Sequence, residues 1–242
     1  MLKKFYQAIL FDMDGVIIDT EQAVSQFWYK LAQVHQIQLT QADFEQHIYG
    51  CPATETLDVL FPNLTPTERR AVLAEMVDYE INQTYTSIRG VMPFLRSLKQ
   101  YGIPTALVTS GATWKVEEVS RQLNLNGAFN AQVTVEDIRK GKPHPECYLL
   151  AAQQLRKAPE QCLVFEDSVQ GMQAAVAAGT LAIGVQHSPN LATLLRQAGA
   201  WQVVPDFSSI SLQAQTVDQR EDQANLILQI GQQESLMLQP PN

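Results

Sequence analysis

Short apolar runs that alternate with helix-like segments constrain the fold of this chain more than any other feature. Each run has the length of a strand and is apolar at consecutive positions rather than at every second position. Continuous apolarity is what a parallel sheet requires when helices cover both of its faces. The runs lie at Gln7–Phe11, Thr105–Thr109, Phe129–Val133, Cys162–Phe165 and Leu181–Val185. They predict an α/β fold with a doubly wound, mostly parallel sheet.

The alternation is interrupted between Thr20 and about Arg89, where the chain shows only amphipathic, helix-like segments. These segments are Glu21–Gln36, Gln41–Ile48, Thr54–Leu60 and Thr67–Tyr85. Such a long connection between two parallel strands predicts a helical cap subdomain at 20–89, inserted into a core formed by 1–19 and 90–207. The alternative is that these helices pack directly on the sheet.

The C-terminal segment 208–242 has a different pattern. Ser211–Val217 and Asn225–Ile230 could pair as a hairpin around Asp218–Asp222. The Gln-rich end through Pro240 and Pro241 is expected to fray. We therefore predict either a hairpin or a frayed tail.

The composition is that of an ordinary globular protein, with 45% hydrophobic and 17% charged residues. The net charge of -8 argues against a nucleic-acid partner. The same charge would repel a small anion unless local groups offset it. The longest apolar window, Ala174–Val185, is shorter than the roughly 20 residues that cross a bilayer, so we predict no membrane partner.

The cysteines indicate a reducing compartment. Cys51, Cys147 and Cys162 are widely spaced and form no CxxC pair, which favours neither a disulfide framework nor a zinc site. Asp12 and Asp14 interrupt the apolar stretch near the N-terminus before it resembles an export signal. We expect a cytoplasmic protein that is a monomer or a weak dimer.

Polar residues follow four of the predicted strands, at the edge where open α/β sheets bind their ligands. They are Asp12 and Asp14, then Thr109-Ser110-Gly111, then Lys140-Gly-Lys142, and finally Glu166-Asp167-Ser168. Acids, a hydroxyl beside a glycine, and a lysine are the groups that magnesium-assisted phosphoryl transfer uses. Each group by itself could be a turn, a helix cap or a solvated charge, but their joint placement at successive strand ends predicts a site.

These motifs resemble the four ordered motifs of the haloacid dehalogenase-like hydrolase superfamily. The matching stretches are Phe11-Asp-Met-Asp-Gly-Val-Ile-Ile-Asp19-Thr20, Val108-Thr-Ser-Gly111, Gly141-Lys-Pro-His-Pro145 and Val164-Phe-Glu-Asp-Ser-Val-Gln-Gly171. The resemblance covers about residues 7–205. It implies a doubly wound core with a helical cap inserted just after the first motif, in agreement with the interruption at 20–89.

The resemblance also implies a role for each motif residue. Asp12 would be the nucleophile that becomes an aspartyl phosphate, and Asp14 the acid and then the base. Asp12, the main-chain carbonyl of Asp14, and Asp167 would hold Mg²⁺, with Glu166 orienting the waters of the ion. The phosphoryl group and substrate would be bound by Thr109, Ser110, the Gly111 amide, Lys142 and the cap residue Gly50, and Lys142 would offset the negative charge.

Other residues narrow the resemblance. Asp14 indicates a phosphatase or a phosphomutase. Beta-phosphoglucomutases, however, carry a His soon after the first motif and an Arg shortly after a Gly of the cap, and neither the His nor the Arg is present here. Ala23–Trp28, His47–Gly50 and Arg139–Leu149 resemble the glycerol-3-phosphatase, 2-deoxyglucose-6-phosphatase and bacterial sugar phosphatase group. The expected partner is a small phosphorylated metabolite such as glycerol 3-phosphate or a hexose phosphate. A hexose phosphomutase, a phosphoglycolate phosphatase and a non-catalytic phosphosugar-binding protein remain alternatives.

Overall fold

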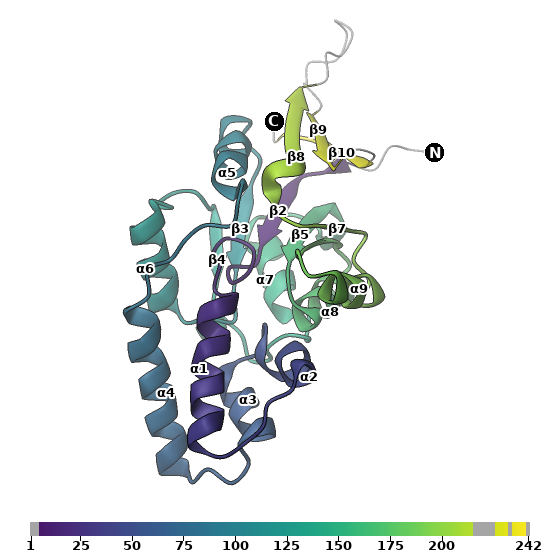
Figure 1. The fold of residues 1–242 in the computed structure, drawn as a ribbon. Coiled ribbons are helices and arrows are strands. Elements are labelled where there is room, and N and C mark those ends of the chain that lie inside the picture. The colour runs from purple at the N-terminus through teal and green to yellow at the C-terminus, as the bar shows by residue number, and fades with distance from the viewer. Residues whose placement is uncertain (1–4, 215–225, 232–233, 241–242) are drawn as a thin grey trace, which may run out of the picture.

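The computed structural model describes residues 5–214, 226–231 and 234–240, and its centre is a six-stranded parallel sheet (Figure 1). The strand order is β4-β3-β2-β5-β6-β7, and each neighbouring pair is parallel. The bounds are β2 (Ala8–Phe11), β3 (Thr105–Val108), β4 (Ala131–Val133), β5 (Cys162–Glu166), β6 (Leu181–Val185) and β7 (Gln202–Val204). The predicted doubly wound α/β fold is confirmed, and β7 is a strand that the apolar pattern did not indicate.

Both faces of this sheet are covered, which accounts for the continuous apolarity of its strands. Ile9 and Phe11 point to one face and Ala8 and Leu10 to the other, and all four are fully buried. The first face packs against α5 (Val91–Gln100) and α6 (Thr113–Leu123). The second packs against α7 (Glu146–Gln154), α8 (Val169–Ala177) and α9 (Pro189–Gln197).

An aromatic cluster fixes the end of the central strand from which the first acidic motif leaves the sheet. The ring of Phe11 stacks on Phe165 of the neighbouring strand with centroids 5.4 Å apart. Phe207, just after β7, packs on Phe165 at 5.0 Å, and Phe94 of α5 meets Phe11 edge-on at 6.1 Å. Because Asp12 directly follows Phe11, this packing holds the start of the acidic turn in place.

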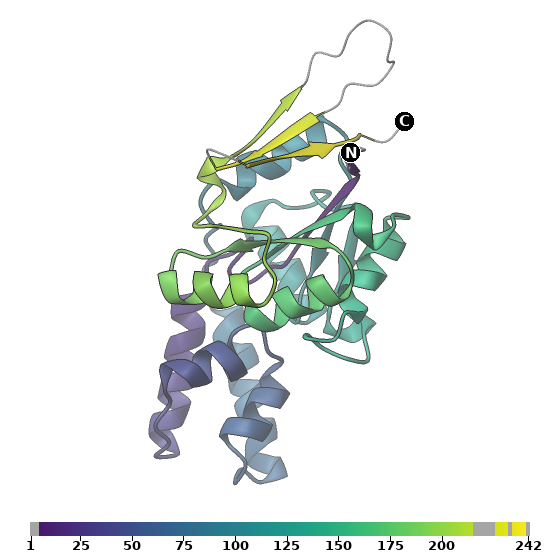
Figure 2. The same cartoon turned by 90° about the vertical axis from the view of Figure 1, so that its right-hand side faces the viewer.

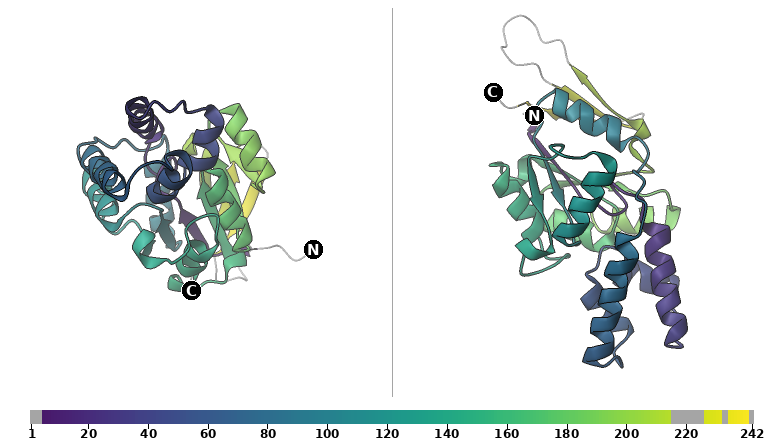
Figure 3. Two further views of the ribbon diagram at one scale, coloured as in Figure 1. Left: turned by 90° about the horizontal axis from the view of Figure 1, so that it is seen from below. Right: turned by 90° about the vertical axis from the view of Figure 1, so that its left-hand side faces the viewer.

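The residues between β2 and α5 form helices at one end of the molecule (Figures 2 and 3). They are α1 (Glu21–Val34), α2 (Gln41–Asp43), a π-helical turn (Phe44–Ile48), α3 (Ala53–Leu60) and α4 (Pro66–Ile81). We call α1 to α4 the helical segment. Thr65 and Glu68 form a capping box that starts α4, with Pro66 in its first turn. The segment has its own buried cluster around Phe27, Trp28 and Phe61, separate from the clusters on the sheet.

The C-terminal strands form a second sheet at the opposite end of the molecule from the helical segment (Figure 1). Its order is β1 (Phe5–Tyr6), β10 (Glu234–Leu238), β9 (Leu226–Ile230) and β8 (Ile210–Ala214). The strands β8 and β9 pair antiparallel, as the predicted hairpin requires, whereas the connecting residues 215–225 lie outside the described part of the chain. Fraying of the Gln-rich end is wrong for Glu234–Leu238, because this strand pairs with β9 and with the N-terminal strand β1.

The helices in the described ranges are all too short or too polar to cross a membrane.

Candidate active site

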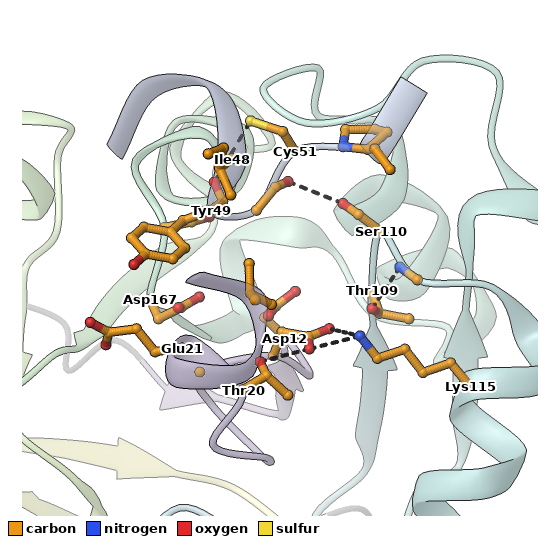
Figure 4. A pocket seen from close by; sticks show the side chains of 18 of the residues that line it. Asp12, Thr20, Glu21, Ile48, Tyr49, Cys51, Thr109, Ser110, Lys115 and Asp167 are labelled. Carbon is orange, nitrogen blue, oxygen red and sulfur yellow. Dashed lines mark hydrogen bonds and ion pairs between the residues drawn. The ribbon is translucent and has the colours of Figure 1, made fainter. Parts of the chain in front are cut away.

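The predicted site residues gather at the carboxyl edge of the parallel sheet, beside the helical segment. Most of them line one pocket of about 300 Å³ between the sheet and the helices (Figure 4). The predicted residues in its lining are Asp12, Asp14, Gly50, Thr109, Ser110, Gly111 and Asp167. Lys142 and Glu166 are buried behind Asp12 rather than in the lining itself. The structure therefore brings all of the predicted residues together at one place.

The Asp-Met-Asp-Gly motif forms a tight turn. The carbonyl of Met13 accepts hydrogen bonds from the backbone N–H groups of Ile17 and Ile18, at 2.8 and 3.0 Å. Gly15 has a φ of 72°, and a Cβ added there would lie 2.0 Å from Oδ2 of Asp167. Two features therefore require glycine at this position: the positive φ of the backbone and the close approach of the Asp167 carboxylate.

A buried lysine joins two of the acids. Lys142 is 2% exposed, and its Nζ donates to Asp12 Oδ1 at 2.5 Å and to Glu166 Oε1. Burial by itself would lower the pKa of Lys142, but the negative charges of Asp12 and Glu166 outweigh burial and hold this pKa above its usual range. Lys142 therefore places a permanent positive charge directly beside Asp12.

Protein groups already occupy both oxygens of Glu166. Oε1 accepts from Lys142 and from the Tyr148 hydroxyl at 2.7 Å, and Oε2 accepts from the backbone N–H groups of Asp167 and Ser168. A Cβ at Gly171 of α8 would lie 1.7 Å from Oε1, so the carboxylate fits only because that residue is glycine. Glu166 is thus built to hold Lys142 in place.

Three carboxylates crowd together at a possible cation site. One oxygen each from Asp12, Glu166 and Asp167 lie within 4.8 Å of one another. Burial raises the pKa of Asp167 well above its ordinary value, and the charges of Glu166 and Asp12 raise it further. Burial likewise raises the pKa of Asp12 to about 8, although Lys142 opposes the shift. Such crowding of oxygen ligands fits a hard divalent cation such as Mg²⁺.

Because Glu166 is already saturated, the oxygens left to face a cation belong to Asp12 and Asp167. That Asp12 and Asp167 are the ligands and that Glu166 acts from behind them stays a prediction. The predicted third ligand is the main-chain carbonyl of Asp14.

The motif after β3 faces the helical segment. The Ser110 hydroxyl donates to the Gly50 carbonyl at 3.3 Å, and the Gly111 N–H donates to Thr109 Oγ1 at 2.9 Å. Gly50 has a φ of 75°, and a Cβ there would lie 2.3 Å from the Ser168 hydroxyl. These contacts bring Gly50 against the strand ends, and a phosphoryl oxygen would have to compete with them for Ser110 and Gly111.

Sequence reasoning missed a second buried lysine. Lys115 of α6 donates to both oxygens of Asp14, at 2.9 and 3.2 Å, and to Glu80 of α4 at 2.9 Å. Thr20 also donates to Asp14, at 2.8 Å. Burial would lower the pKa of Lys115, but the charges of Asp14 and Glu80 outweigh it and raise this pKa. The only signal in the sequence was that Lys115 follows Ser110 by five residues.

Tyr148, which supports Glu166, was missed as well. It is fully buried, and its ring lies 5.3 Å from the Nζ of Lys142, which places an aromatic face beside the cation. In the sequence it is one of several apolar and aromatic residues on α7, so nothing distinguishes it from an ordinary core residue.

Comparisons with known proteins agree with this geometry. The sequence model of the haloacid dehalogenase-like hydrolase family matches residues 6–179 of this chain. A phosphorylated carbohydrates phosphatase from Thermotoga maritima is 34% identical over 203 residues, which cover 82% of this chain and 94% of that protein. The 2-deoxyglucose-6-phosphate phosphatase 2 of Saccharomyces cerevisiae is 31% identical over 221 residues, which cover 84% of this chain and 89% of that protein.

A solved structure has a similar fold. A protein described as a putative beta-phosphoglucomutase from Bacteroides vulgatus superposes with a TM-score of 0.74 at 27% identity, covering 85% of this chain and 86% of that one. The resemblance predicted from the four motifs is confirmed, and the chain belongs to the haloacid dehalogenase-like hydrolase family.

Proposed function

We propose that this phosphoric monoester hydrolase releases phosphate from a small phosphorylated sugar or polyol, with Mg²⁺ as cofactor and an aspartyl phosphate as intermediate. One observation supports the proposal above all others. Asp12 lies in the lining of the pocket, is bound to the buried cation Lys142, and stands next to the carboxylate of Asp167. A nucleophilic carboxylate, a fixed positive charge and a cation-binding partner are the parts that phosphoryl transfer needs.

The residues divide the proposed reaction between them. A carboxylate oxygen of Asp12 forms a bond to phosphorus while the ester P–O bond breaks, and Asp14 donates a proton to the departing alkoxide. Asp14 then accepts a proton from water, whose oxygen attacks phosphorus and releases Asp12. Lys142 offsets the charge shared by Asp12 and the phosphoryl group throughout. Mg²⁺ bound at Asp12 and Asp167 would supply further charge neutralisation.

The charge of the pocket favours a leaving group rich in hydroxyls over one that carries an acid. The carboxylates of Glu21, Glu45 and Glu80 are part of the lining. Among the described lining residues Lys115 is the only cation, and it is already bound to Asp14 and Glu80. Sugar hydroxyls can donate hydrogen bonds to such carboxylates, whereas the carboxylate of phosphoglycolate would be repelled.

The same charges count against a phosphomutase, which must hold a second phosphate far from the nucleophile. The names of the Thermotoga and yeast relatives also refer to carbohydrate phosphates, in support of the same substrate class. We therefore propose the sugar or polyol phosphatase, and keep mutase and phosphoglycolate activity as outcomes of the assay.

Phosphate release from a panel of esters tests the proposal. With Mg²⁺ we expect turnover of glycerol 3-phosphate, 2-deoxyglucose 6-phosphate or fructose 1-phosphate, little turnover of phosphoglycolate, and loss of activity in EDTA that added Mg²⁺ restores. If phosphoglycolate is preferred, or phosphate moves between two positions of one sugar without release, the proposed substrate class or reaction is wrong. Activity that is insensitive to EDTA would contradict the role of the metal.

Asp14→Asn should lower kcat by a factor of about 10²–10⁴, the contribution of a positioned acid-base group. The amide keeps the size of the side chain but can neither donate the carboxyl proton nor accept one from water. Steady-state kinetics on the best sugar phosphate measure the effect, and unchanged kcat would remove Asp14 from the proton transfers.

A further inference from the structure

Lys115 occupies a place where neither its burial nor its position on the helix favours a lysine. It lies in the first turn of α6 (Thr113–Leu123), where the positive end of the helix dipole repels a cation. It is only 5% exposed. Groups outside α6 must therefore compensate this charge, and these groups are the carboxylates of Asp14 and Glu80.

The hydrogen bonds of Lys115 leave it no donor for a ligand. Its ammonium group has three N–H bonds, and it contacts three carboxylate oxygens, two on Asp14 and one on Glu80. Although Lys115 lines the pocket, it is committed to the protein rather than to a phosphate. In Figure 4 the ammonium group of Lys115 lies on the Asp12 and Thr20 side of the pocket, away from Ser110.

The arrangement repeats the one around Asp12. Lys142 lies between Asp12 and Glu166, and Lys115 lies between Asp14 and Glu80. Each aspartate of the Asp-Met-Asp motif thus has its own buried lysine, and each lysine has a glutamate as its second partner. The difference lies in the glutamate: Glu166 ends strand β5, whereas Glu80 belongs to the helical segment.

The helical segment is joined to the core at the start of α1 and after the end of α4, and a residue near each of these two places is linked to Asp14, directly or through Lys115. Thr20, which donates to Asp14, immediately precedes α1, and Glu80 lies one residue before the end of α4. Gln122 of α6 holds the chain just after α4: it donates to the Gln83 carbonyl at 3.1 Å and accepts from the Tyr85 N–H at 2.9 Å. Glu80 is therefore fixed relative to the helix that carries Lys115.

We propose that Lys115 is a positioning residue: bound to Glu80, and acting with Thr20, it holds the Asp14 carboxylate in one orientation and so links proton transfer to the placement of α4. The inference rests on the proposed function, in which Asp14 transfers the protons. A misplacement of about 1 Å can cost on the order of 100-fold in rate, so a residue that only orients Asp14 can still control kcat.

The first test is Lys115→Met, which keeps an unbranched side chain of similar size and removes the charge. We expect kcat on the best sugar phosphate to fall by about 10- to 100-fold with KM changed less than about 2-fold, since Lys115 contacts neither phosphate nor leaving group in this proposal. Lys30→Met is the matched control: Lys30 pairs with Glu75 on the surface of the helical segment, and its loss should leave kcat unchanged.

A double-mutant cycle separates positioning from a general structural effect. In the Asp14→Asn background, Lys115→Met should lower kcat little further, because the group that it positions is already inactive. Glu80→Gln, which retains the Lys115–Asp14 pair, should give a smaller fall in kcat that likewise disappears in Asp14→Asn. Thermal unfolding of each variant reports whether the fold is intact, and if Lys115→Met does not fold, the Glu80→Gln cycle decides.

Three results would overturn the inference: wild-type kcat in Lys115→Met, a rise in KM alone, or a loss of equal size with and without the Asp14 carboxylate. A rise in KM alone would indicate that Lys115 binds the phosphate. Full activity of Asp14→Asn is a different result, because it would refute the acid-base role in the proposed function and the positioning inference with it.

Discussion

Asp12→Asn should abolish turnover, with a fall in kcat on the order of 10⁴ or more. The amide has nearly the same shape as the carboxylate but no negative charge, so it cannot attack phosphorus to form the acyl phosphate. It also removes one of the two negative partners of Lys142, the other being Glu166. Phosphate release measures the loss, and mass spectrometry of acid-quenched wild-type enzyme should show a phosphorylated chain that is missing in the variant.

Asp58→Asn is the matched control for this substitution. Asp58 lies on α3, pairs with Arg69 on the surface and is not part of the pocket lining, so the same chemical change should leave kcat unaltered. Substantial activity in Asp12→Asn would refute the nucleophile assignment, provided that the intact mass shows no deamidation back to aspartate.

Lys142→Met should lower kcat by about 10²–10³, the usual cost of removing one preorganised charge-stabilising donor. It should also lower the melting temperature. Without Lys142 the buried carboxylates of Asp12 and Glu166 face each other with no cation between them, and breaking a buried ion pair typically costs about 3–5 kcal/mol. Kinetics and thermal unfolding of one preparation give both effects.

A second substitution separates the two effects of Lys142. Glu166→Gln added to Lys142→Met removes one of the two uncompensated buried charges, so the double variant should regain part of the lost stability. It should regain no activity, because the positive charge beside Asp12 is still missing. Recovery of kcat together with stability would mean that Lys142 serves the fold rather than the chemistry.

The part of the site that could be predicted from sequence is the part that parallel strands bring together. Asp12, Ser110 and Asp167 follow buried strands, and the carboxyl ends of neighbouring parallel strands meet at one edge of a sheet. The apolar runs are local and periodic, so they indicate those strand ends directly.

The partners of these residues could not be predicted in the same way. Lys115 and Glu80 are separated by 35 positions, and each by itself resembles a solvated charge on a helix. Tyr148 resembles an ordinary core residue until its hydroxyl is seen to bind Glu166. The strand β10 pairs with β9 and with β1, and the second of these partners lies at the other end of the chain.

The sequence by itself determined the parallel sheet, the helical segment and the four motifs that mark the family, because strand and helix periodicity are properties of neighbouring residues. Only the tertiary structure decided which lysine neutralises which aspartate, that Glu166 is saturated by protein groups, and that Glu80 reaches Asp14 through Lys115. Such contacts depend on how distant elements pack, and a charge acquires its role from the groups that surround it after folding.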